Sequence, residues 1–309
     1  MPDKPNGNSG LFANPYLLLV IAPLFWGGNA VVGKLATSEW LPFTFSVFRW
    51  LCAAIILFPF AAKHLLNDRA IVRANIRVLL ALGAVGMAGF NMLFYLALRY
   101  TTAVNVSIIQ AVMPVFIIAA NFLVFRQRVV ALQSLGLILS ILGVMIISTS
   151  GNPLTFVTGG LNRGDLIMLI ASAFYAAYTF GLRWRPDIHW LSFMWMLALG
   201  AILGSLPFAL WEMATTGFGV PSINGWWMLA YVMLFPTVLG QLAYAKGVSI
   251  LGSNRASLFI NLVPIFGSLL AVLVLREAFR WHHAAGLVMV VSGIMLAEYF
   301  AGRAATGAN

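Results

Sequence analysis

The sequence has little charge and almost no cysteine. Charged residues make up 8% of the 309 positions and hydrophobic residues 61%, whereas about 25% of an ordinary soluble domain is charged. A soluble core of this length cannot hide so much apolar surface, so the composition indicates an integral membrane protein. The one cysteine, Cys52, excludes an internal disulfide, and its place inside an apolar run is typical of a packing residue.

Acidic residues are scarcer than basic ones, with 8 Asp and Glu against 18 Lys and Arg. A net charge of +10 would suit nucleic acid if the basic residues formed one patch, but they lie between apolar runs. With a cytoplasmic N-terminus, the inner loops and tails hold Lys4, Lys63, Arg69, Arg73, Arg77, Arg126, Arg128, Arg183, Arg185, Lys246, Arg255 and Arg303. The outer loops and span ends then hold only Lys34, Arg99, Arg163, Arg276 and Arg280. This asymmetry favours a bacterial inner membrane with both termini cytoplasmic, and the lipid bilayer rather than nucleic acid as partner.

Ten apolar stretches of about 20 residues follow one another, the length that crosses the hydrocarbon as a helix. They lie at 15–36, 43–62, 78–98, 103–125, 131–149, 164–182, 191–212, 225–246, 254–275 and 283–302. The runs lack the alternation of barrel strands, so we expect an all-α integral membrane protein with ten transmembrane helices. Residues 1–14 are polar and indicate a disordered tail, and 303–309 form a short C-terminal tail.

Two parts of the chain, 91–148 and 241–298, repeat each other at an offset of 150 residues. The matching landmarks are Pro114 with Pro264, Arg126 with Arg276, Gly136 with Gly286, Gly143 with Gly293, and the amides Asn91 with Gln241. We therefore expect a first five-helix repeat at 15–150 and a second at 151–302. Because five is odd, the second copy is inverted, and transporters of this design bind substrate near the midplane between their repeats. A bundle duplicated for structure alone is the alternative.

Several short motifs stand in the order found in a known family. They are Trp26-Gly27, Phe48-Arg49, the run from Tyr95 to Ala103, Pro114, Pro264, and Glu277 followed by Gly286 and Gly293. With these motifs the chain resembles the drug/metabolite transporter superfamily, in the branch built from two EamA-type repeats, and most closely its aromatic amino-acid exporters. The resemblance implies export of a small molecule by alternating access. In one departure, Gln127 stands where the second repeat has Glu277.

Motifs for other functions are missing from the sequence. It contains no HExxH, no GxSxG and no His near a mid-span Ser or Asp, so we expect no enzyme. It contains no filter sequence of a channel. His282 and His283 are adjacent and face different sides of a helix, so we expect neither a metal site nor a cofactor. No pattern sets the oligomeric state, and a monomer is compatible with the sequence.

Polar and aromatic side chains inside the spans are the candidate substrate contacts, because such groups are unfavourable in lipid without partners. The candidates are Trp26, Asn29, Asn91, Tyr95, Ser107, Gln110, Tyr175, Tyr178, Gln241, Tyr244 and Asn261. Rings provide stacking and amides provide donors and acceptors, which suits an aromatic or other neutral amino acid in a central cavity. Each residue can instead join helices or lie in an interfacial belt. A broad-specificity drug or metabolite exporter fits the same set.

Arg49 is the one cation well inside a span, and Lys34 lies nearer the interface. Either is a candidate contact for a substrate carboxylate, but for Arg49 we favour a structural role, bonded to backbone carbonyls or paired with Glu39. Pro114 and Pro264 lie in mid-span, where a missing N–H kinks a helix, and we expect hinges there, with packing accommodation alone as the alternative. Because the sequence places no carboxylate or His in mid-span, we expect facilitated transport or exchange, with proton coupling as the alternative.

Overall fold

The structure is a computed structural model that describes residues 14–126, 131–152, 162–251, 256 and 259–305. Within these residues all regular elements are helices, which agrees with the predicted all-α class. The first half contains α1 (Pro15–Ala36), α2 (Pro42–Asn67), α3 (Arg69–Ala74), α4 (Ile76–Leu82), η2 (Gly83–Gly89), α5 (Phe90–Tyr100), α6 (Ala103–Ile109), η3 (Gln110–Val112), α7 (Met113–Phe125) and α8 (Ala131–Ser148). The second half contains α10 (Arg163–Gly181), η4 (Leu182–Trp184), α11 (Trp190–Thr216), α12 (Ile223–Val232), η5 (Met233–Leu239), α13 (Gly240–Leu251), α15 (Leu262–Leu275) and α16 (Trp281–Ala305).

Seven of the helical segments are long and apolar enough to cross a membrane. They are Pro15–Ala36, Pro42–Asn67, Ile76–Tyr100, Ala103–Val124, Arg163–Trp184, Trp190–Thr216 and Ile223–Leu251. Three shorter apolar helices, Ser134–Ser148, Leu262–Leu275 and Trp281–Leu296, overlap the other three predicted stretches, the last beginning two residues before its stretch. The chain is thus a multi-pass helical membrane protein, and the count of ten spans stays a prediction. Predicted residues 1–13, Gln127 and most of the connector at 149–163 lie outside the described part.

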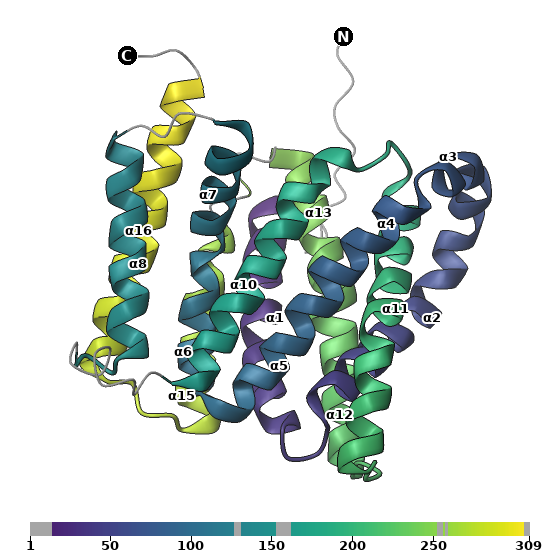
Figure 1. Cartoon of the computed structure of the whole chain (residues 1–309), viewed down its shortest axis with the longest axis horizontal. Coiled ribbons are helices and arrows are strands. Elements are labelled where there is room, and N and C mark those ends of the chain that lie inside the picture. The colour runs from purple at the N-terminus through teal and green to yellow at the C-terminus, as the bar shows by residue number, and fades with distance from the viewer. Residues whose placement is uncertain (1–13, 127–130, 153–161, 252–255, 257–258, 306–309) are drawn as a thin grey trace.

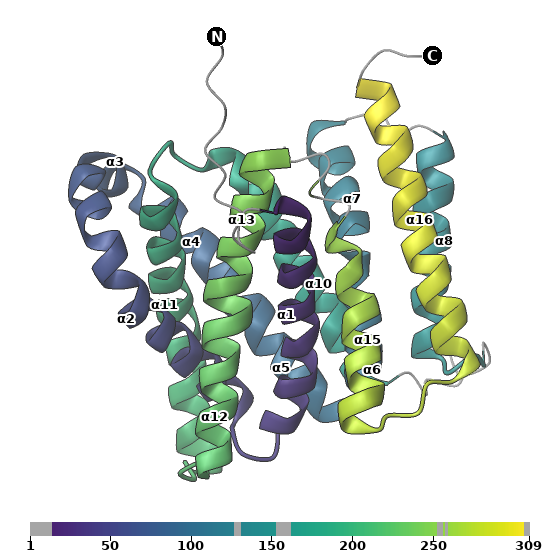
Figure 2. The ribbon, with the colours of Figure 1, turned by 180° about the vertical axis from the view of Figure 1, so that it is seen from behind.

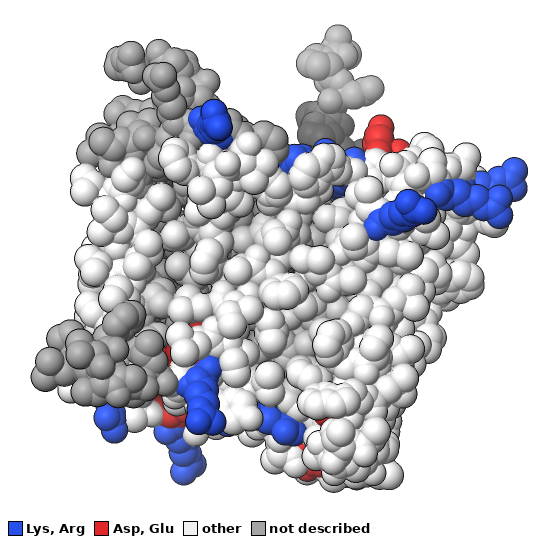
Figure 3. All heavy atoms as spheres, viewed as in Figure 1, with Lys and Arg blue, Asp and Glu red and all other residues white. Residues whose placement is uncertain are grey.

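The surface charges lie at the two ends of the helical bundle. In the view of Figure 3, Lys and Arg side chains gather along the upper and lower rims, and a broad band between them is uncharged. Many large apolar side chains are exposed on the helices, for example Ile55, Leu123 and Leu273 at 63%, 75% and 66%. An apolar belt between charged rims is the surface that lipid requires. The helix α1 begins and the helix α16 ends at the same end of the bundle (Figure 1).

Local irregularities in the helices recur at the repeat offset. The π-helical turns η2 and η5 span Gly83–Gly89 and Met233–Leu239, which are 150 positions apart. Arg126 and Arg276, another matched pair, both end their helices with left-handed backbone, at φ 51° and 55°. A left-handed residue other than glycine is uncommon. Its recurrence at matched positions shows that the two halves share backbone detail as well as hydrophobic pattern.

The matched glycines of the repeat lie between α8 and α16, which run side by side at one edge of the bundle (Figures 1 and 2). A Cβ added at Gly143 would come within 2.9 Å of the Gly286 carbonyl oxygen, and one at Gly293 within 2.5 Å of the Gly136 carbonyl oxygen. Ser140 Oγ lies 3.4 Å from the Val290 carbonyl oxygen across the same contact. Small residues here let the two backbones approach, as in other membrane helix pairs.

Carboxylates at the span ends cap helices of the opposite half. Glu212 of α11 accepts hydrogen bonds from Phe43 N at 3.0 Å and Thr44 N at 2.9 Å, at the start of α2. Glu39, after α1, accepts from Ser222 N at 2.9 Å, at the start of α12. The first N–H groups of a helix have no partner within it, and the helix dipole favours a negative charge there. Two of the few acidic residues therefore tie the two halves together.

Candidate functional site

A buried arginine joins four helical elements near the centre of the structure. Arg49 of α2 donates from Nη1 to Asn91 Oδ1 at 2.7 Å, to the Tyr95 hydroxyl at 2.5 Å and to Asn29 Oδ1 at 3.4 Å. Its Nε donates to Thr237 Oγ1 at 2.7 Å. Tyr95 in turn donates to Asn29 Oδ1 at 3.0 Å. We call these five residues, from α1, α2, α5 and η5, the Arg49 cluster.

The Arg49 cluster is closed off from the surroundings, since its members are 2% to 7% exposed. All four partners of the guanidinium are neutral. Within the described residues, the hydrogen bonds of the guanidinium come from Nε and Nη1. A buried charge is normally paired with an opposite charge, so this cation is suited to an anionic ligand.

The proline turn of the eighth predicted span positions Thr237. Pro236 has no N–H, so the carbonyl one turn before it loses its usual helical partner. Thr237 Oγ1 donates to that carbonyl, Val232 O, at 2.7 Å and accepts from Arg49 Nε at the same time. The local π-helix η5 thus turns a threonine hydroxyl toward the first half of the chain. A threonine directly after a mid-span proline was the sequence feature that could have indicated this contact.

The geometry corrects the predicted partners of Arg49 and shows the partners of Lys34, whose role as a substrate contact stays a prediction. Arg49 does not pair with Glu39, because Glu39 bonds to Ser222, and its partners are side chains rather than the expected backbone carbonyls. Lys34 does not join the cluster: its Nζ donates to the carbonyl oxygens of Leu98 at 2.6 Å and Thr101 at 2.7 Å. Those carbonyls end α5, where a helix favours a positive charge. Sequence alone cannot separate these roles, because all depend on which helix packs beside α1 and α2.

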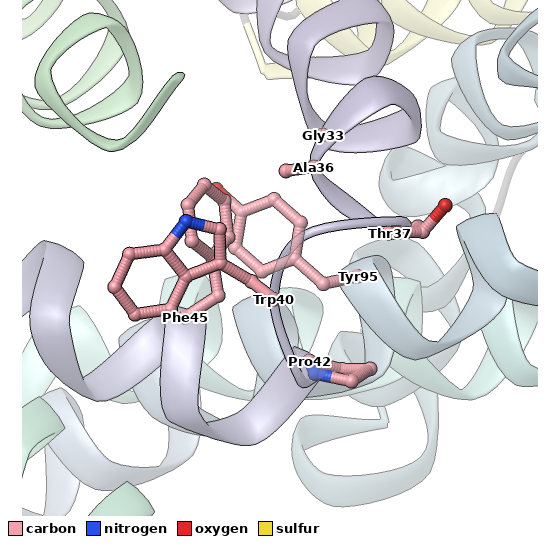
Figure 4. A pocket seen from close by; sticks show the side chains of 7 residues that line it. All are labelled: Gly33, Ala36, Thr37, Trp40, Pro42, Phe45 and Tyr95. Atoms are coloured by element: carbon pink, nitrogen blue, oxygen red, sulfur yellow. The ribbon is translucent and has the colours of Figure 1, made fainter. Parts of the chain in front are cut away.

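An aromatic pocket lies against the Arg49 cluster. Gly33, Ala36, Thr37, Trp40, Pro42, Phe45 and Tyr95 line it, and Figure 4 shows the three rings grouped around it. The ring centroids of Phe45 and Tyr95 are 4.8 Å apart, and those of Trp40 and Phe45 are 5.6 Å apart. The pocket measures about 10 Å³, which is room for roughly one water. Tyr95 belongs to both sites, with its ring in the pocket and its hydroxyl on Arg49.

A larger groove of about 130 Å³ continues from the aromatic pocket toward the surface, sharing Thr37 and Trp40 with it. Its other lining residues include Glu39, Arg99 and Phe218. Trp40 lies between the two pockets, and its indole Nε1 donates to the Gly225 carbonyl oxygen at 2.9 Å while its ring packs on Trp226 at 5.1 Å. These contacts join the two halves of the chain at this end.

Trp26 lies outside the Arg49 cluster but on the same interface between the halves. Its Nε1 donates to the Pro236 carbonyl at 3.0 Å, and its ring centroid lies 5.4 Å from that of Tyr244 on α13. The predicted neighbours Trp26 and Tyr244 are thus brought together, although 218 residues separate them. Gln241, one turn before Tyr244, is partly exposed and has no hydrogen bond to the cluster within the described residues.

The other predicted site residues are dispersed. Tyr175 and Tyr178 of α10 pack against the first half, with Tyr175 5.3 Å from Phe90 and Tyr178 beside Gly86 of η2. Ser107 is fully buried against Gly267 of α15, and its Oγ has no hydrogen-bond partner. The Nε2 atom of Gln110 also has no hydrogen-bond partner. Asn261 is partly exposed and precedes α15. The described residues therefore bring together Asn29, Asn91 and Tyr95, but they form no single cavity around the whole predicted set.

The two mid-span prolines lie at helix interruptions. Pro114 is in the first turn of α7, directly after the 3₁₀ turn Gln110–Val112. Pro264 is in the first turn of α15, after a turn at Asn261. A proline fits the first turn of a helix because the N–H it lacks has no partner there. The interruptions agree with the predicted kinks, and their use as hinges stays a prediction.

Comparisons with known proteins agree on one family. A model of the EamA-like transporter family matches the chain twice, over residues 13–149 and 162–299. The chain is 26% identical over 282 residues to the uncharacterized transporter YetK of Bacillus subtilis, covering 91% of this chain and 86% of that protein. It is 26% identical over 297 residues to the uncharacterized inner membrane transporter YicL of Salmonella typhimurium, covering 91% and 93%. A solved crystal structure matches with a TM-score of 0.61 at 16% identity, covering 94% of this chain and 99% of that one, which shows a shared fold.

Proposed function

The chain belongs to the EamA-like transporter family, and we propose that it exports aromatic or other neutral amino acids, or related metabolites, as a secondary transporter. The observation that carries this proposal is the Arg49 cluster: a buried cation with neutral partners that links the two halves of the chain. The family and the similar proteins are transporters, not enzymes.

Arg49 supplies the contact for the substrate carboxylate. A guanidinium matches a carboxylate with two parallel N–H donors, and the described hydrogen bonds of Arg49 use only Nε and Nη1. As Arg49 turns toward a substrate, the oxygens of Asn29 and Asn91 are released and become acceptors for the substrate ammonium. Both ends of a zwitterion are thereby satisfied by one cluster without any acidic residue.

The aromatic pocket supplies the contact for the substrate side chain. The Tyr95 hydroxyl bonds Arg49, and the rings of Trp40 and Phe45 line the same pocket as the Tyr95 ring. Rings packed edge to face on another ring add about 0.5–1.5 kcal/mol beyond the burial of apolar area. A ligand with a carboxylate at one end and a flat apolar group at the other therefore fits this site better than a polar or phosphorylated one, because a phosphate favours several Lys or Arg contacts.

Transport would proceed by alternating access between two inverted repeats. Three observations support this: the irregular turns recur at the 150-residue offset, α1 and α10 run in opposite directions (Figure 1), and the Arg49 cluster crosses the interface. Movement of η5 away from α2 would break the bond between Arg49 and Thr237 and enlarge the pocket. Pro114 and Pro264 lie where the helices are already interrupted, which suits hinges.

We place the protein in a bacterial inner membrane. Both termini then lie on the cytoplasmic side, because the basic residues are asymmetrically distributed between the loops. The groove at Glu39, Trp40 and Phe218 then faces the outside and forms the exit. The contact of Trp40 with Gly225 lies at this exit.

Counterflow of radiolabelled phenylalanine into proteoliposomes tests the proposal. We expect saturable uptake by the wild type and a loss of about 30-fold or more in Arg49→Met, because removing one side of a buried charged contact costs about 2 kcal/mol or more, at 1.4 kcal/mol per factor of ten. Arg49→Lys keeps the positive charge but lacks the two parallel N–H donors of the guanidinium, so its counterflow should lie between those of the wild type and Arg49→Met. Arg69→Met, at an exposed arginine of α3, is the matched control.

Monodisperse elution in detergent checks that each variant is folded. Wild-type counterflow in Arg49→Met would remove Arg49 from the substrate site. Wild-type protein that carries hydrophobic cations or sugars but no amino acid would replace the amino-acid proposal with the broad-specificity exporter.

A further inference from the structure

A second group of charged side chains meets at the turn between α5 and α6. Asp165 of α10 accepts hydrogen bonds from Thr101 Oγ1 at 2.6 Å and from Asn105 Nδ2 at 3.1 Å and 3.2 Å. Lys34 donates to the Thr101 carbonyl. Glu277 accepts from Ala103 N and Val104 N, both at 2.9 Å, and interacts electrostatically with Lys34. One positive and two negative charges from α1, α10 and the segment after α15 thus converge on this turn.

Asp165, in the first turn of α10, is the most deeply buried charged residue of this group. It is 1% exposed, and both of its oxygens receive hydrogen bonds only from neutral side chains. Glu277, by contrast, is partly exposed and caps the first amides of α6, where the helix dipole favours an anion. A buried carboxylate with neutral partners is strongly disfavoured in its charged form. A proton on Asp165 would also bring the whole group to zero net charge.

The surroundings of Asp165 accommodate both of its protonation states. The Asn105 oxygen Oδ1 is buried and has no hydrogen-bond donor, and the residue is 9% exposed. As the structure stands, the Asn105 amide nitrogen donates to a charged carboxylate. If the amide turned over, Oδ1 would accept a hydrogen bond from a protonated Asp165, since an Asn side chain offers a donor on one side and an acceptor on the other.

Within the described residues, no hydrogen bond joins Asp165 to another charged side chain. Arg163, on α10 itself, is exposed, and Arg99 of α5 is exposed and donates to the Trp40 carbonyl oxygen at 3.2 Å. The described residues of α6, α7 and η2 carry no ionisable side chain apart from those at the turn.

We propose that Asp165 binds the proton that drives transport. The proposal rests on the transport function above and revises the sequence expectation of facilitated transport, which treated Asp165 as a span-end residue. Protonation weakens the bonds from Thr101 and Asn105, because hydrogen bonds to a charged acceptor are about twice as strong as neutral ones. It therefore loosens α10 from the α5–α6 turn. Tyr95 of the Arg49 cluster lies on α5, so the proton site and the substrate site share a helix.

Proteoliposomes with a pH-sensitive dye inside test the proposal. In the wild type we expect phenylalanine movement to be accompanied by proton movement and to be accelerated by an imposed pH gradient. Asp165→Asn should keep counterflow within about threefold but lose its response to the pH gradient. Glu212→Gln, which alters another buried carboxylate bonded to backbone amides, should keep that response. Counterflow without proton movement in the wild type, a normal response in Asp165→Asn, or coupling to a sodium gradient instead would each overturn the proposal.

Two further measurements separate this proposal from the transport function. Acid titration of the purified protein in detergent needs no substrate: the wild type should take up about one proton more than Asp165→Asn, and equal uptake overturns the proton site even if transport is confirmed. If Asp165→Asn does not fold, Thr101→Val serves instead. Losing a donor to the charged carboxylate should move the midpoint of pH-driven uptake upward by about one pH unit, and an unchanged midpoint overturns the assignment.

Discussion

Replacing Thr237 with valine removes two buried hydrogen bonds without changing the size of the side chain. Thr237 Oγ1 accepts from Arg49 Nε and donates to the Val232 carbonyl, both at 2.7 Å, and the residue is 5% exposed. Valine fills the same space and can do neither. The substitution therefore isolates the hydroxyl that joins η5 to α2.

The expected loss of stability follows from the kind of each bond. A hydrogen bond to a charged group contributes about 1.5–3 kcal/mol. A neutral hydrogen bond inside a membrane protein contributes about 0.6 kcal/mol on average. We expect Thr237→Val to lose about 2–4 kcal/mol. At about 2 °C per kcal/mol for a chain of this size, this lowers the melting temperature by about 4–8 °C.

Thermal unfolding in detergent, followed by tryptophan fluorescence, measures this difference. Thr215→Val is the matched control, because Thr215 Oγ1 also donates to a helix carbonyl, that of Trp211 at 2.9 Å, but at an exposed site of α11. Its melting temperature should stay within about 1 °C of the wild type. Equal melting of the two variants would refute the reasoning. So would full additivity with Arg49→Met, since residues in contact should show a coupling of about 0.5–3 kcal/mol.

Two further predictions concern the interface between α1 and the second half. Gly27→Ala should lower the melting temperature by about 2–6 °C, because the new Cβ would lie 2.6 Å from Gly267 N and the overpacking costs about 1–3 kcal/mol. Gly219→Ala, with nothing within 4 Å, is the control, and equal melting would contradict the close contact. Trp26→Phe loses the bond to Pro236 but keeps the ring, so it should melt about 1–2 °C lower and retain counterflow. A loss above about threefold would place Trp26 in direct contact with substrate.

The class of protein and the position of its helices could be predicted from the sequence, because both depend on local hydrophobic length. The apolar stretch 15–36 coincides with α1. The helix α2 extends to Asn67, beyond the predicted limit of 62, and hydrophobic length could not predict this extension because its residues include polar ones. The matched arginines of the repeat also anticipated structure, since Arg126 and Arg276 end their helices in the same way. The matches at 13–149 and 162–299 to one family model follow the same division of the chain.

The candidate site was only partly predictable. Asn29, Asn91 and Tyr95 were recognisable as polar groups in apolar runs, and the structure joins them. Thr237 was missed, because a threonine in an apolar run is ordinary unless the arginine it meets is known. Asp165 was set aside as a span-end residue, although the packing of α10 on α5 buries it almost completely.

By itself, the sequence determined that this protein is helical, spans a membrane several times and repeats its own pattern, because hydrophobic length and landmark spacing are properties of neighbouring residues. The tertiary structure alone decided what the charges do. Arg49 meets Thr237 across 188 positions, Glu212 meets Thr44 across 168, and Asp165 meets Thr101 across 64. In lipid each charge must find its partner inside the protein, and which partner is available depends on the order in which the helices pack.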